Sequence, residues 1–65
     1  MQTPSIQTVF KDKELNNTYR VIAYKRLTLE EVRRVVALHI FDHPTLRKKK
    51  DQTVEIETTL GMSKR

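Results

Sequence analysis

Apolar and polar residues alternate in three stretches of this chain, at residues 6–11, 18–26 and 53–60. Alternation with a period of two is typical of strands that bury one face, and it predicts a strand in each stretch. Residues 18–26 form the clearest of the three because they are rich in β-branched and aromatic side chains. Between the first two strands, Asn16 and Asn17 tolerate left-handed backbone geometry and indicate a turn.

Residues 28–43 instead follow a helical period. Their start has the pattern of a capping box, in which the Thr28 hydroxyl accepts from the Glu31 amide and the Glu31 carboxylate accepts from the Thr28 amide. Pro44 disfavours helical geometry at His43 and therefore indicates where the helix ends. The helical face expected to pack on a core is formed by Leu29, Val32, Val36 and Ile40.

The order strand, strand, helix, strand predicts a small α+β domain of ββαβ type, with one helix packed on a three-stranded sheet. We expect a single domain over residues 1–65, with frayed tails at 1–5 and 62–65. A chain of this length buries only about 60% of its unfolded surface, so a monomer would be marginally stable. The residues expected in the core are Phe10, Val21, Ala23, Leu29, Val32, Val36, Ile40, Val54, Ile56 and Leu60.

The chain contains no cysteine, which excludes disulfides and thiolate metal sites as sources of stability. Homodimerisation is then the aid to stability that we favour. No apolar run is long enough to span a membrane, and the N-terminus lacks the pattern of a signal peptide. We therefore expect a cytoplasmic protein with no membrane partner.

Positive charge is unevenly distributed along the chain. The net charge is +5 overall, made up of +3 over residues 1–27, −1 over 28–43, +3 over 44–53 and zero over 54–65. A basic surface favours acidic partners, including nucleic acid, through steering and counterion release. The same surplus is also common in proteins that are basic for solubility alone.

Two groups of basic residues could contact nucleic acid. Residues 44–52 are expected to form a long connection that carries four adjacent cations, which either grip phosphates or only aid solubility. The outer sheet face offers two arginines and a tyrosine, as in RNA-stacking platforms, but Glu55 and Glu57 should emerge on the same face and pair with the arginines. The candidate residues are Arg20, Tyr24, Arg26, Arg47, Lys48, Lys49 and Lys50.

The sequence contains few residues in a pattern suited to metal binding or catalysis. His39 and His43 have the spacing of two-histidine metal sites, but no third ligand is evident nearby, so we interpret them as side chains at the edge of the core. Gly61 is the only glycine, which rules out a glycine-rich phosphate loop. A chain this small is not expected to form a deep pocket. We therefore expect no metal, no cofactor, no small-molecule substrate and no enzymatic activity.

Leu38 and Phe41 point away from the core-facing side of the predicted helix. Either the 44–52 connection or the N-terminal tail covers them, or they form a partner-binding patch flanked by Arg34. From the sequence we expect a non-enzymatic binding module that acts through protein–protein contacts, with a protein partner or a second copy of itself. The alternative is a nucleic-acid-binding protein, and a third interpretation is a structural subunit whose basic termini contact RNA or lipid.

Overall fold

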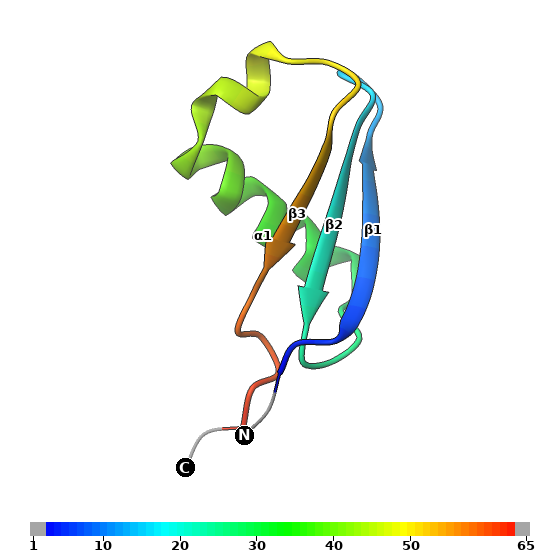
Figure 1. Ribbon diagram of the computed structural model, residues 1–65, viewed down its shortest axis with the longest axis vertical. Coiled ribbons are helices and arrows are strands. Elements are labelled where there is room, and N and C mark those ends of the chain that lie inside the picture. The colour runs from blue at the N-terminus through cyan, green and yellow to red at the C-terminus, as the bar shows by residue number, and fades with distance from the viewer. Residues whose placement is uncertain (1–2, 64–65) are drawn as a thin grey trace.

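The fold is described by a computed structural model, in which residues 3–63 are placed. Its elements, in chain order, are β1 (Ile6–Asp12), β2 (Asn17–Ala23), α1 (Leu29–Asp42), the short 3-10 helix η1 (Pro44–Lys48) and β3 (Thr53–Glu57). One helix packs with a three-stranded sheet, as Figure 1 shows. The predicted α+β class and the ββαβ order are confirmed. No helix within the described residues is long and apolar enough to cross a membrane.

The central strand of the sheet is β2. It pairs antiparallel with β1 on one side and parallel with β3 on the other. A parallel pair cannot be joined by a tight turn, so the chain must travel back along the sheet between β2 and β3. Helix α1 and η1 make that return (Figure 1). The register places Val21 of β2 opposite Thr8 of β1 and Ile56 of β3.

The predicted capping box is present at the start of α1. The Glu31 amide donates to the Thr28 hydroxyl over 3.2 Å, and the Thr28 amide donates to the Glu31 carboxylate over 2.9 Å. Two amides that no helical carbonyl could reach are thereby satisfied. At the other end, the His43 amide donates to the carbonyls of His39 and Ile40, and the helix stops before the proline, as predicted.

The core lies between α1 and one face of the sheet. Two expected core residues are wrong: Leu29 is 63% exposed and Leu60 is 36% exposed. Leu27, directly before the cap, is buried instead and belongs to the same cluster as Val32. Leu27 and Val32 have the spacing of a hydrophobic staple, in which the residue before the cap packs against the first turn of the helix. The buried apolar residues are Tyr19, Val21, Ala23, Leu27, Val32, Val36 and Ile56, with Phe10, Ile40 and Val54 among those partly buried against them.

The C-terminal ends of β2 and β3 and the 44–52 segment differ most from the sequence prediction. Strand β2 ends at Ala23 rather than at residue 26, and β3 ends at Glu57 rather than at residue 60. Single hydrogen bonds continue the pairing beyond β3, the last one from the Tyr24 amide to the Leu60 carbonyl at 3.3 Å. The 44–52 segment is not wholly a loop, because Pro44 begins η1, where its fixed φ suits the first turn of a helix.

Both ends of the described chain lie at one end of the sheet, and the β1–β2 turn lies at the other (Figure 1). The turn contains Asn16 with φ of +57°, which confirms the predicted left-handed geometry. The segment that leads into β3 runs beside this turn and contains a second left-handed residue, Asp51. The Asp51 amide donates to the carbonyl of Leu15 over 3.0 Å, so the two segments are joined.

Candidate functional site

The outer helix face, formed by Arg34, Leu38 and Phe41, is exposed on α1 on the side away from Val32 and Val36. Leu38 is 61% exposed and Phe41 is 80% exposed. The expectation that the 44–52 segment could cover them is wrong, because the apolar residue of η1, Leu46, packs against the core cluster instead. Two large apolar side chains one turn apart are therefore left in solvent.

The charged side chains beside Leu38 and Phe41 form only a weak ion pair. The Arg34 guanidinium lies 3.9 Å from the Glu30 carboxylate, one helical turn earlier, and both side chains are largely exposed. An exposed pair at that distance contributes little to stability. The guanidinium can therefore turn to another group with little loss to the fold.

Arg20 lies at the centre of the uncovered sheet face. Its guanidinium donates to Glu55 of β3 at 2.9 Å and to Gln7 of β1 at 2.8 Å, so it bridges all three strands. The predicted cross-strand pairing of arginine with glutamate is thus confirmed for Arg20 and Glu55. Tyr24 and Arg26 lie beyond the end of β2, so the structure does not align them with Arg20 on one strand.

The four adjacent cations are exposed at the end of the molecule that carries the β1–β2 turn. Arg47 and Lys48 end η1, and Lys49 and Lys50 follow it. The backbone here is held by Asn17, whose fully buried side chain donates to the Lys49 carbonyl at 3.0 Å and accepts from the Gln52 amide at 2.8 Å. The sequence pattern indicates only a turn at Asn17 and gives no sign of this role.

His39 and His43 have ring centroids 4.5 Å apart near the C-terminal end of α1. Partial burial, and then the neighbouring His43, lower the pKa of His39 below its ordinary value of 6.5. A search of residues 3–63 finds no group of three or more side chains suited to hold a metal ion. His39 is half-buried, as expected for a side chain at the edge of the core, whereas His43 is exposed.

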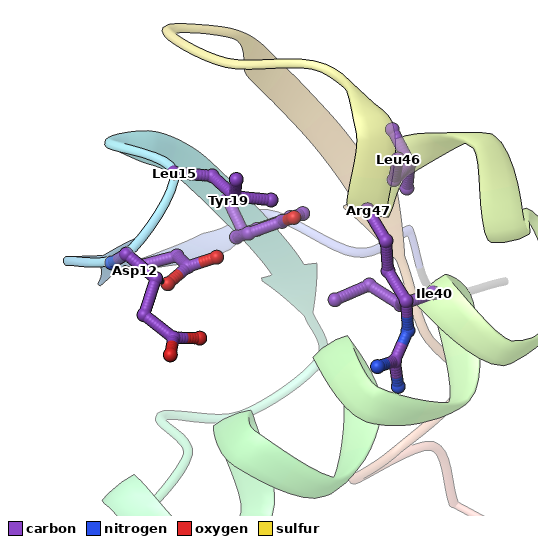
Figure 2. Close-up of a pocket in the computed structure, with 7 residues that line it drawn as sticks. Asp12, Leu15, Tyr19, Ile40, Leu46 and Arg47 are labelled. Atoms are coloured by element: carbon purple, nitrogen blue, oxygen red, sulfur yellow. Dashed lines mark hydrogen bonds between the residues drawn. The ribbon is translucent and has the colours of Figure 1, made fainter.

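A cleft of about 500 Å³ lies between the β1–β2 turn, the second half of α1 and η1. Figure 2 shows it with Tyr19 extending between Asp12 on one side and Arg47 on the other. The sequence did not predict a pocket, because its walls come from segments far apart in the chain. Its lining consists of Asp12, Glu14, Leu15, Tyr19, Ile40, Leu46 and Arg47.

Comparison of the chain with protein-family models, with curated proteins and with solved structures finds no match in any of the three. The arrangement of this chain's own side chains is therefore what bears on its function.

Proposed function

We propose that this protein is a small non-enzymatic binding module that self-associates through the outer helix face. The observation that carries the proposal is the exposure of Leu38 and Phe41, two large apolar side chains that the fold leaves uncovered beside Arg34. Burial of apolar surface is the main driving force of protein association. Aromatic side chains and arginine are the residues most enriched at interface hot spots.

A second copy fits this face in a two-fold, antiparallel arrangement of the α1 helices. With Leu38 of each copy close to the axis, Phe41 of one copy would lie opposite Arg34 of the other, and the reverse contact would follow by symmetry. A guanidinium over an aromatic ring is a favourable cation–π contact. The weak pairing of Arg34 with Glu30 costs little to rearrange.

The charge distribution supports contact along α1. Residues 28–43 carry −1 net charge, whereas residues 1–27 and 44–53 each carry +3. Two copies that meet along this helix bring their least positive segments together and keep the basic segments apart. Repulsion between two molecules of charge +5 is further reduced by salt, so the association should not weaken at high ionic strength.

A single introduced cysteine tests the arrangement, because the natural chain has none. Leu38→Cys places a thiol close to the two-fold axis, where two copies can form a disulfide. Exposed Thr59, which lies outside α1, provides the matched control as Thr59→Cys. Under mild oxidation at equal concentration, Leu38→Cys should form a covalent dimer much faster than Thr59→Cys. Equal rates for the two variants would contradict the proposed interface.

Nucleic-acid binding is the second candidate function, and one observation favours it. The side chains of residues 47–50 are exposed while Asn17 fixes the backbone that carries them, so these cations do not have to be ordered from a flexible loop. Ordering a flexible loop costs conformational entropy, and a fixed backbone avoids part of that cost. Arg20, by contrast, is engaged by Glu55 and Gln7.

A further inference from the structure

Strand β1 lies at one edge of the sheet, and its outer side pairs with no other strand within residues 3–63. It pairs with β2 over seven consecutive residues without a bulge, so its backbone is regular and extended. Because alternate residues of a strand direct their N–H and C=O groups to opposite sides, about half of these groups on β1 point away from β2. This edge therefore offers a row of backbone donors and acceptors to another extended segment.

The edge lacks the features by which proteins usually protect an exposed strand. Those features are charged side chains, prolines, bulges and a very short strand. Residues 6–10 of β1 have the sequence IQTVF, which contains no charge, no proline and no glycine. The strand at the other edge, β3, has only five residues, and two of them are glutamates. The unprotected edge of the sheet is therefore that of β1.

A groove of about 410 Å³ lies along this edge. One wall is β1 itself, from Ile6 to Val9, and the other is the connection between β2 and α1, which passes beside the start of β1 (Figure 1). That connection contributes Leu27, which is buried, and Arg26, which is exposed. Ile6 is 38% exposed and Val9 is 56% exposed. The groove therefore combines open backbone groups with apolar side chains that solvent reaches.

The edge also has unpaired positive charges. Arg26 lines the groove and Lys11 lies near the end of β1, and neither forms an ion pair within residues 3–63. Residues 1–27 carry +3 net charge. Two copies that met along β1 would bring these segments together and repel each other, whereas an acidic segment would be attracted. The charge therefore favours an acidic partner over a second copy at this edge.

We propose that β1 binds an extended acidic segment of a partner protein, which adds to the sheet as a fourth strand. The backbone of the segment pairs with the outer edge of β1, and in this mode of recognition the backbone hydrogen bonds provide affinity while alternate side chains provide specificity. None of the residues that line the groove belongs to α1. The proposal therefore does not rest on self-association through the outer helix face, and a failure of one leaves the other standing.

The alternation of side chains on β1 sets the pattern of the partner segment. Phe10 packs against the core cluster, so Ile6, four residues earlier, is on the same face of the strand, toward α1. Val9 is opposite Arg20 in the register, so Val9 and Lys11 are on the uncovered face. Apolar side chains of the segment would therefore lie on the α1 side, beside Ile6, and acidic side chains would lie on the uncovered side, near Lys11.

The test uses a capped seven-residue peptide of alternating glutamate and valine, titrated into the ¹⁵N-labelled protein and followed by NMR. One control peptide has lysine in place of each glutamate. A second control peptide is N-methylated at every residue, which keeps the side chains but removes all backbone donors. The protein variants are Arg26→Gln and Val9→Glu. Their matched controls, Arg47→Gln on η1 and Thr53→Glu on β3, make the same charge changes outside the groove.

We expect the glutamate peptide to produce saturable shifts of the amide signals of residues 6–11, and slower hydrogen exchange at those amides of β1 that point away from β2. The lysine peptide and the N-methylated peptide should bind at least about tenfold more weakly. Arg26→Gln should weaken binding of the glutamate peptide by about threefold, and Val9→Glu by about tenfold. The two control variants should bind like the natural protein.

Shifts that do not saturate, or that centre on β3, would overturn the proposal. Equal affinity of the N-methylated peptide would exclude backbone pairing, and equal affinity of the lysine peptide would exclude the acidic preference, so either result would overturn it as well. Equal weakening by Arg26→Gln and Arg47→Gln would reduce the effect to overall charge and remove the role of the groove. A Leu38→Glu variant that still forms dimers, with the β1 edge amides protected in the absence of peptide, would assign the edge to a second copy and overturn the acidic partner.

Discussion

The side-chain amide of Asn17 donates to the backbone carbonyl of Lys49 across 32 positions in the chain, over a distance of 3.0 Å. The same side chain accepts from the Gln52 amide, and the Thr18 amide next to it donates to the Gln52 carbonyl over 2.7 Å. A second contact joins the Asn16 and Asp51 side chains. Together these bonds fix the end of the basic segment against the β1–β2 turn, at the point where β3 begins.

Asn17→Ala should lower the free energy of unfolding by about 2–4 kcal/mol, because two backbone groups lose their partners at a fully buried position. Chemical denaturation followed by circular dichroism measures the change. Gln52→Ala is the matched control, because Gln52 contributes only backbone atoms to these bonds and should stay within about 0.5 kcal/mol of the natural protein. Equal loss in both variants would show that the Asn17 bonds do not hold the segment.

The capping box predicts a second, smaller effect. Thr28→Ala removes the side chain that accepts from the Glu31 amide and should cost about 1 kcal/mol of stability. The exposed Thr59 lies outside the helix, so Thr59→Ala serves as the control and should have no comparable effect. A denaturation midpoint that does not change in Thr28→Ala would contradict the role of this cap.

Acidification should destabilise the fold through His39. Because burial and His43 lower its pKa in the folded chain, the unfolded chain binds this proton more readily. The contribution of His39 is therefore complete above about pH 6.5, declines as the pH falls below that value, and levels off below the folded pKa. Thermal unfolding at pH 7.5 and 5.5 should show a smaller loss for His39→Gln than for the natural protein. An equal loss in both would mean that other groups govern this pH range.

The nucleic-acid alternative makes a prediction about salt. If phosphates bind the basic segment, replacement of Lys48, Lys49 and Lys50 by Gln should weaken binding to all sequences and reduce the slope of log affinity against log salt by about 3 units. Replacement of Lys11, Lys13 and Lys25 by Gln removes the same charge elsewhere and should change the slope less. Fluorescence anisotropy with a labelled oligonucleotide measures both. An absence of binding by the natural protein at low salt would remove this alternative.

Local sequence patterns predicted most of the fold because the relevant interactions are local. The capping box around Thr28 and Glu31 lies within four residues, and alternation in β2 directly reports which face is buried. Leu29 was misplaced because it satisfies the helical period as well as any core residue does. In the structure Leu27, which lies outside the helix, is buried in the core cluster instead. A helical wheel does not include that residue.

The candidate sites also differ in how far the sequence could predict them. The exposure of Leu38 and Phe41 was expected as one of two alternatives, since their helical positions follow from the sequence but their cover depends on where the 44–52 segment packs. The Asn17 bonds and the cleft at Tyr19 join segments more than 20 residues apart. These contacts depend on the pairing of β2 with β3 and on the position of η1. The periodicity of the sequence reveals neither of them.

The central claim is that the outer helix face joins two copies of the chain, and sedimentation equilibrium tests it most directly. The natural protein should show a mass that rises from monomer to dimer with concentration. Leu38→Glu should stay monomeric while its circular dichroism spectrum remains native, because the new carboxylate is desolvated only when a second copy docks. Leu29→Glu is the matched control, since Leu29 is exposed on α1 but lies outside this face, and it should still dimerise. A natural protein that remains monomeric at millimolar concentration would contradict the claim.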